Sequence, residues 1–154
     1  MAARSRFGHR SLTLVTAGRG LLDTNTVILL PRLSEALLPD QPLIAAVTLA
    51  ELSVGPLLAA SESQRALRLA ELQQAESDFD ALPFDAVAAR AFGQVAASLR
   101  RAGRKTSSRT YDAMIAATAI ANELPLYTCN PGDFAGIEGL EVVAVPHPDA
   151  PAAD

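Results

Sequence analysis

The chain has 154 residues, of which 49% are apolar and 19% charged, and its formal net charge is −4. This length is sufficient for one domain with a substantial core, and the composition is that of a globular protein, which excludes a disordered or fibrous chain. Its apolar runs are shorter than the roughly 18 residues that cross a bilayer, and its single cysteine, Cys129, cannot form an internal disulfide. We therefore expect a cytoplasmic protein, without a membrane segment, in which Cys129 is a packing residue.

The charge is distributed unevenly along the chain. Residues 1–20 carry four arginines and no acidic residue, so the rest of the chain has a net charge of −8. A domain this acidic does not bind a polyanion through its overall charge. If it acts on nucleic acid, it needs a local basic strip or bound cations.

The two ends of the chain differ in composition from the segment between them. Residues 1–19 are rich in arginine and serine and lack an apolar stretch long enough for a secretory signal, so we expect a disordered extension. Residues 146–154 are rich in proline and alanine, which predicts a frayed tail. We expect one domain at residues 20–145. His9 and His147 lie in the two tails and are not expected to take part in catalysis.

The first expected element is a short buried strand, residues 20–22, which ends on Asp23. A helix is expected to follow over residues 24–38, with a break near Pro31. Asp is among the preferred N-cap residues. Capping of this helix is therefore the structural alternative to a functional role for Asp23.

The next segment contains two helix-start signals. Residues 43–47 are all apolar, which predicts a strand buried on both faces. Thr48 and Glu51 have the spacing of a capping box, with Thr48 at N-cap and Glu51 at N3 of a helix that extends toward residue 58. Ser61 and Gln64 form a second box, which predicts a helix to about residue 76.

A second strand–helix pair follows. Residues 81–84 are a short strand candidate, and Asp85 is expected to cap the helix after it. Apolar residues at four-residue spacing predict one buried stripe on this helix: Val87, Ala91, Val95 and Leu99. Gly103 is the expected C-terminal stop.

The last third of the domain repeats the alternation. We expect a basic loop over residues 103–109, a helix over 110–123, a strand at 126–128 and a closing strand at 141–145. Asn130 and Pro131 predict the N-cap and N1 of a short helical turn between these two strands. The whole pattern predicts an α/β chain, with a central, mainly parallel sheet covered by helices on both faces in a three-layer α/β/α sandwich.

Four acidic residues follow strands or open helices: Asp23, Glu51, Asp112 and Asp133. Because the carboxyl ends of parallel strands lie on one edge of a sheet, residues at these junctions are expected to converge there. Asp112 does not directly follow a strand, and each acid alone is explained as a cap or a helix-dipole partner. Four converging carboxylates, however, would repel by on the order of 4 kcal/mol per close pair. A hard divalent cation, Mg²⁺ or Mn²⁺, would remove that repulsion.

Four segments in order carry a family resemblance: Leu-Leu-Asp-Thr-Asn at 21–25, Val-Thr-Leu-Ala-Glu-Leu at 47–52, Tyr-Asp-Ala-Met-Ile-Ala-Ala-Thr-Ala at 111–119 and Leu-Tyr-Thr-Cys-Asn-Pro-Gly-Asp-Phe at 126–134. Together they resemble the motifs of a PIN domain, and most of all those of the VapC-type toxins of type II toxin–antitoxin systems. No single motif is specific, but the four occur in family order and cover nearly all of residues 20–145.

This resemblance implies a PIN-like sandwich and a Mg²⁺- or Mn²⁺-dependent endoribonuclease that cleaves RNA, with tRNA or rRNA as the expected substrate. It also implies a small VapB-like antitoxin as partner and a homodimer. The resemblance extends to individual positions. Asp23 and Asp112 match the principal metal ligands, Glu51 matches the acid that completes the metal site, and Asp133 matches a fourth acid that often binds through water. Asn25 and Thr128 match polar residues that position the carboxylates, and Asn130 accompanies Asp133.

A basic strip leads into Asp112: Arg100, Arg101, Arg104, Lys105 and Arg109. Two interpretations remain open. The strip is either a solvated helix end, where cations face the negative pole of the dipole, or a grip on the phosphate backbone of RNA. The RNA-binding candidates are Arg104, Lys105 and Arg109, with Arg109 the strongest.

Two other functions compete with the nuclease. One is a catalytically silent PIN-like module that binds RNA or protein, against which the complete set of four acids argues. The other is a phosphatase of the haloacid-dehalogenase type. That family has a second Asp two residues after the first, where this chain has Asn25.

Overall fold

The computed structural model describes residues 18–151. Within this range five strands form one sheet in the order β3-β2-β1-β4-β5, and every neighbouring pair is parallel. The strands are β1 Arg19–Leu22, β2 Gln41–Ala45, β3 Ala81–Leu82, β4 Leu126–Thr128 and β5 Val142–Ala144. The α/β class and the parallel sheet are confirmed. The strand β1 lies at the centre of the sheet, so Asp23 follows the central strand.

Five α-helices connect these strands: α1 Thr24–Leu29, α2 Ala46–Val54, α3 Glu62–Asp78, α4 Ala86–Arg101 and α5 Thr110–Ala121. Short 3-10 turns complete the connections: η1 Leu30–Arg32, η2 Glu35–Leu37, η3 Gly55–Leu58, η4 Ser107–Arg109 and η5 Pro131–Phe134. Among the helices of the described residues, none is both long and apolar enough to span a membrane.

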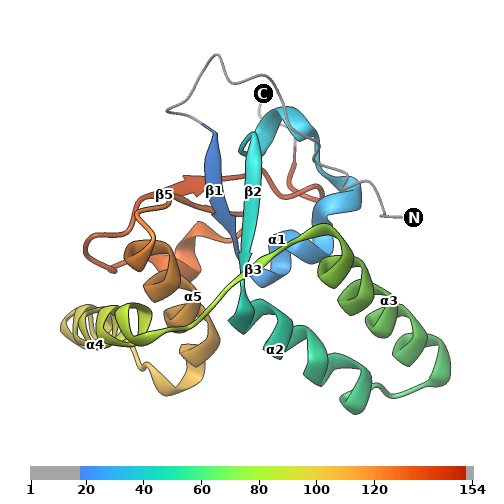
Figure 1. Cartoon of the computed structure of the whole chain (residues 1–154), viewed down its shortest axis with the longest axis horizontal. Coiled ribbons are helices and arrows are strands. Elements are labelled where there is room, and N and C mark those ends of the chain that lie inside the picture. Colours follow the sequence, from blue (N-terminus) through green and yellow to red (C-terminus); the bar gives the residue numbers. More distant parts are fainter. Residues whose placement is uncertain (1–17, 152–154) are drawn as a thin grey trace.

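The helices cover both faces of the sheet, as Figure 1 shows with α4 and α5 on one side and α1 and α3 on the other. Side chains alternate along β1, so Leu21 packs in a core with α4 and α5, while the adjacent Leu22 packs in a second core with α1 and α3. Both leucines are 0% exposed. The three-layer sandwich is therefore confirmed.

The first helix is shorter than the expected residues 24–38. Helix α1 ends at Leu29, and η1 follows with Pro31 in its first turn. Proline has no N–H to donate and crowds the preceding turn. The break near Pro31 is therefore confirmed, but the continuation of the helix to residue 38 is wrong, because two 3-10 turns, η1 and η2, follow instead.

The capping box of Thr48 and Glu51 is also wrong. Helix α2 begins at Ala46 with Ala45 at the N-cap, which provides no side-chain bond. Thr48 is fully buried within the first turn and accepts a hydrogen bond from the Thr24 hydroxyl at 3.2 Å. Because Thr48 packs against α1, it is not available as a cap, and Glu51 lies one turn further into α2. The N-cap of the second box is confirmed, since the Ser61 hydroxyl accepts from the Gln64 amide at 3.2 Å. The Gln64 side chain accepts from the amide of Ala60 at 2.8 Å, not from that of Ser61, so the reciprocal bond of the box is shifted by one residue.

Helix α4 begins as expected, with the Asp85 carboxylate accepting from the Ala88 amide at 3.0 Å. Its buried stripe is shifted at the start, because Val87 is 57% exposed whereas Ala88 is 0% exposed. A helix has about 3.6 residues per turn, so positions four apart drift around its axis. Only the later members Val95 and Leu99 are fully buried. The helix ends before Gly103, whose φ of +73° suits glycine.

Gly20 allows the close packing that positions the end of β1. A Cβ at Gly20 would lie 2.5 Å from the ring of Tyr127 on the neighbouring strand β4. A larger residue at position 20 would therefore require the Tyr127 ring to move.

Parts of the expected tails lie outside the described residues, namely 1–17, with His9, and 152–154. Arg19, expected in the N-terminal extension, is the first residue of β1. After β5, Asp149 forms an ion pair with Arg32 of η1. The boundaries proposed for the domain remain predictions.

Candidate active site

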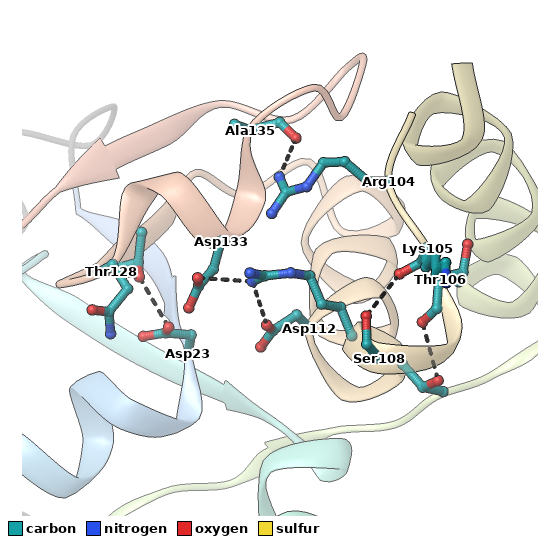
Figure 2. A network of polar contacts seen from close by, with 12 residues as sticks. Asp23, Arg104, Lys105, Thr106, Ser108, Asp112, Thr128, Asp133 and Ala135 are labelled. Atoms are coloured by element: carbon teal, nitrogen blue, oxygen red, sulfur yellow. Dashed lines mark hydrogen bonds and ion pairs between the residues drawn. The ribbon is translucent and has the colours of Figure 1, made fainter. Parts of the chain in front are cut away.

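The four acids lie on the elements that leave the carboxyl edge of the sheet. Asp23 follows β1, Glu51 lies on the helix after β2, Asp133 lies in η5 after β4, and Asp112 lies in the first turn of α5. Figure 2 shows Asp23, Asp112 and Asp133 side by side. The charges of Asp133, Glu51 and Asp23 all raise the pKa of Asp112. The structure therefore brings the four side chains into one neighbourhood.

Asp23 is 2% exposed and held by three hydrogen bonds. Its Oδ1 accepts from the amide of Thr26 at 3.2 Å and also from the hydroxyl of Thr26. Its Oδ2 accepts from the hydroxyl of Thr128 at 2.9 Å, as Figure 2 shows. Asp23 caps α1, so the structural role holds. The same bonds fix both oxygens of the carboxylate at the sheet edge.

The environment of Asp23 opposes its charge. Burial raises the pKa of Asp23, the hydrogen bonds from Thr26 and Thr128 lower it, and the charge of Asp133 raises it again, with a net increase. A nearby cation would reverse this balance and favour the carboxylate.

Thr26 was not among the residues expected from the sequence. It is fully buried, and its hydroxyl, besides donating to Asp23, accepts from the amide of Cys129 at 3.1 Å. It thereby ties α1 to the end of β4. The available signal was the spacing Asp-x-x-Thr, which places a hydroxyl at N3, beside the carboxylate of an Asp N-cap.

The three supporting residues lie in different surroundings. Thr128 contacts Asp23 directly, and the amide of Asn130 donates to the Thr128 hydroxyl at 2.9 Å. Asn130 is the N-cap residue of η5, although its side chain makes no capping bond. Asn25 is exposed. The donors to Asp23 among the described residues are Thr26 and Thr128 rather than Asn25.

Glu51 has an unusual carboxylate. Among the described residues its Oε1 is buried and has no hydrogen-bond partner. An unpaired buried polar atom costs about 1–3 kcal/mol, and more when charged. A cation at this oxygen would offset that cost.

Arg109 contacts two of the acids. Its Nη1 lies 2.7 Å from Oδ1 of Asp133 and 3.8 Å from Oδ2 of Asp112. Burial and the three neighbouring carboxylates raise the pKa of Asp112 from 3.8 to about 6, and Arg109 opposes this rise. The guanidinium thus neutralises part of an acidic cluster that would otherwise repel itself.

The other residues of the basic strip make different contacts. Arg101 pairs with Glu138 at 3.2 Å, and Nη1 of Arg104 donates to the carbonyl of Ala135 at 2.6 Å. Together with Arg109 and Asp133, these contacts attach the segment after β4 to α4 and the loop that follows it. Arg100 and Lys105 are exposed.

The carboxylate oxygens of the four acids are suitable ligands for a hard divalent cation. Mg²⁺ and Mn²⁺ prefer carboxylate oxygens and water, and four carboxylates, one with an unpartnered oxygen, provide such ligands. In the described part of the chain, however, no three acidic, histidine or cysteine side chains lie at metal-ligand spacing. Arg109 is the cation that Asp112 and Asp133 share.

Two hollows share Glu51 as a lining residue. The larger, with a volume of about 500 Å³, is lined by Glu51 and by residues 107–112. The smaller, of about 200 Å³, is lined by Glu51, by Thr24 and Asn25, and by Arg68 and other residues of α1 to α3. Glu51 therefore borders two hollows next to the acidic cluster.

Comparison with known proteins assigns this chain to a family. Residues 20–140 match the model of the PIN domain. The chain is 40% identical over 133 residues to Ribonuclease VapC5 of Mycobacterium tuberculosis, which covers 84% of this chain and 96% of the relative. It is 33% identical over 110 residues to Ribonuclease VapC of Rickettsia bellii, covering 71% of this chain and 81% of the relative.

Solved structures agree. The crystal structure of VapBC-5 from M. tuberculosis, a member of the VapBC family of toxin–antitoxin systems, matches with a TM-score of 0.71 and 38% identity, over 83% of this chain and 99% of the other. DNA-bound VapBC from Salmonella typhimurium matches with a TM-score of 0.64 and 28% identity, over 81% and 96%. This chain therefore belongs to the PIN-domain family, within its VapC branch.

Proposed function

We propose that the chain is a Mg²⁺- or Mn²⁺-dependent endoribonuclease, the toxin of a VapBC-type pair, that acts in the cytoplasm on tRNA or rRNA. The observation that carries the proposal is the acidic cluster of Asp23, Glu51, Asp112 and Asp133 at the carboxyl edge of the sheet. The relatives named ribonucleases support the reaction class.

Asp23 and Asp112 would be the principal metal ligands, with Glu51 completing the site and Asp133 binding through water. A metal held there would activate a water and neutralise charge on the scissile phosphate. Thr26 and Thr128 keep both oxygens of Asp23 in place, which a positioned ligand requires. The expected products are a 5′-phosphate and a 3′-hydroxyl.

Arg109 would neutralise the RNA backbone next to the aspartates that would hold the metal. It is the residue of the basic strip that contacts the acids themselves. Phosphate contacts by arginine supply the sequence-independent part of RNA affinity. An acidic domain needs such a local cation because its overall charge repels the substrate.

A VapB-like antitoxin and a second copy of the chain would bind the apolar surface of α1 to η3. This surface includes Leu57 and Leu58, which are 84% and 73% exposed, and a groove of about 250 Å³ lined by α1 and α3. Exposed apolar surface of this kind marks interaction sites. The VapBC assemblies among the structural relatives support the partner class.

The decisive experiment compares wild type with Asp23→Asn. After brief induction in cells, sequencing of RNA ends should reveal new 5′-phosphate ends in the wild type and none in the variant. In vitro, cleavage of bulk tRNA and rRNA should require Mg²⁺ or Mn²⁺ and stop on chelation. A folded wild-type protein that cleaves no RNA with either metal would instead favour a catalytically silent binding module.

A further inference from the structure

The larger hollow beside Glu51 has walls of a particular chemistry. Its lining includes Glu51 and Asp112 of the acidic cluster together with the segment 107–111. Any occupant of this hollow would therefore lie directly beside the candidate metal site. Its volume of about 500 Å³ falls in the range of small-ligand pockets.

Tyr111 gives this hollow an aromatic surface. Its side chain is 42% exposed. The other large hydrophobic side chains exposed in the described part of the chain are all aliphatic. It immediately precedes Asp112 on the first turn of α5. An aromatic ring exposed beside a phosphodiesterase centre can stack on a base of any identity.

Polar groups complete the same lining. The hollow is also lined by three residues that carry hydroxyls, Ser107, Ser108 and Thr110, and by Arg109. The hydroxyls of Ser108 and Thr110 already donate to backbone carbonyls of the loop, so their oxygens can accept from a ligand. Stacking, hydroxyl contacts and one cation are the means by which proteins bind single-stranded RNA.

The smaller hollow, which Glu51 also lines, includes Thr24 and Asn25 but lacks an aromatic surface. It is lined by Ile28, Leu52, Glu71 and Arg68, with no aromatic ring. Nη1 of Arg68 already donates to the carbonyl of Gly55 at 2.9 Å. The chemistry for a base is therefore on the side of residues 107–112.

We propose that the hollow formed by Glu51 and residues 107–112 binds the nucleoside next to the scissile phosphate, with its base stacked on Tyr111. This inference rests on the proposed function and adds a subsite to it. The hydroxyls of Ser107, Ser108 and Thr110 contact the ribose or the base edge. Tyr111 is then a substrate-binding residue that sets affinity and base preference.

The absence of tryptophan from the sequence allows a direct test. Tyr111→Trp places a single indole in the hollow, and Val87→Trp places a matched one on exposed α4. Both are prepared in the Asp23→Asn background, which prevents cleavage, and titrated with a ten-nucleotide oligoadenylate in Mg²⁺. Quenching of the indole at position 111, but not at 87, is the expected result. Equal responses of the two indoles would overturn the proposal.

Kinetics on the otherwise wild-type enzyme supply a second readout. Tyr111→Ala should raise KM for RNA by about 5- to 100-fold, the usual range for one lost stacking contact. Tyr111→Phe should stay near wild type because the ring remains, and Val87→Ala should be unchanged. An unaltered KM in Tyr111→Ala, with binding of a VapB-like antitoxin lost instead, would overturn the subsite in favour of a protein contact. A wild-type enzyme that neither binds nor cleaves RNA would overturn the proposed function itself.

Discussion

Nη1 of Arg109 lies 2.7 Å from Oδ1 of Asp133 and 3.8 Å from Oδ2 of Asp112. One guanidinium therefore neutralises two carboxylates that are candidate metal ligands. Both a metal ion and Arg109 are stabilised by the same negative charges, so they compete for them. Release of Arg109 by the metal would leave its charge available for a phosphate.

Arg109→Ala should consequently change the affinities for Mg²⁺ and for RNA in opposite directions. Mg²⁺ binding, measured by calorimetry, should tighten several-fold because the competing cation is gone. RNA binding at saturating Mg²⁺ should weaken, and its salt slope should decrease by about 1, as expected for one lost phosphate contact. Arg90→Ala, an exposed arginine on α4, is the matched control. Equal Mg²⁺ affinity in wild type and Arg109→Ala would contradict the competition.

Asp112 provides a pH-dependent prediction. Its pKa rises from 3.8 to about 6 in the fold, so the folded protein binds this proton more tightly than the unfolded chain does. The resulting stabilisation is complete below pH 3.8 and is lost as the pH rises through about 6. At pH 7.5 without metal, the charged side chain therefore destabilises the fold.

Asp112→Asn should remove this cost. Urea unfolding in EDTA should show the variant more stable than wild type by on the order of 2 kcal/mol at pH 7.5, with the gain shrinking as the pH falls toward 4. Added Mg²⁺ should stabilise the wild type and have little effect on the variant. A variant that is less stable at pH 7.5 would mean that Asp112 makes favourable contacts that outweigh its repulsion.

Thr128 tests the positioning of Asp23. Its hydroxyl donates to Oδ2 of Asp23 at 2.9 Å, and the side chain is fully buried. Thr128→Val keeps the shape but removes the donor, and should lower activity or Mg²⁺ affinity by about 10- to 100-fold. Thr128→Ser, which retains the hydroxyl, is the control and should restore most of the loss. Two variants with the same activity would show that the bond does not position the carboxylate.

The sequence predicted the class of fold because periodicity and strand–helix alternation depend on local residues. The helix starts at Ser61 and Asp85 were correct for the same reason, since both caps are short-range bonds. The start of α2 was wrong because Thr48 satisfies a contact with Thr24, which is remote in the sequence. The strand order was not derivable from local pattern.

The candidate site was likewise predictable only in part from the sequence. The four acids could be named because they follow strands or open helices, and parallel topology brings such positions together. Their partners could not be derived so easily. Thr26 is three residues from Asp23, but its second bond, to the Cys129 amide, depends on the pairing of β1 with β4. The contact of Arg109 with Asp133 likewise requires the packing of η5 beside α5.

Arg104 and Lys105, adjacent in the sequence, should behave differently when each is replaced by alanine. Arg104 donates to the Ala135 carbonyl at 2.6 Å, whereas Lys105 is exposed. Arg104→Ala should therefore lower the free energy of unfolding by about 1 kcal/mol, the usual net value of one such bond. Lys105→Ala should leave stability unchanged and reduce only the salt dependence of RNA binding. Urea unfolding and RNA titration at several salt concentrations measure both effects. If Lys105→Ala leaves the salt slope unchanged, Lys105 is a solvated charge at the helix end rather than part of the RNA grip.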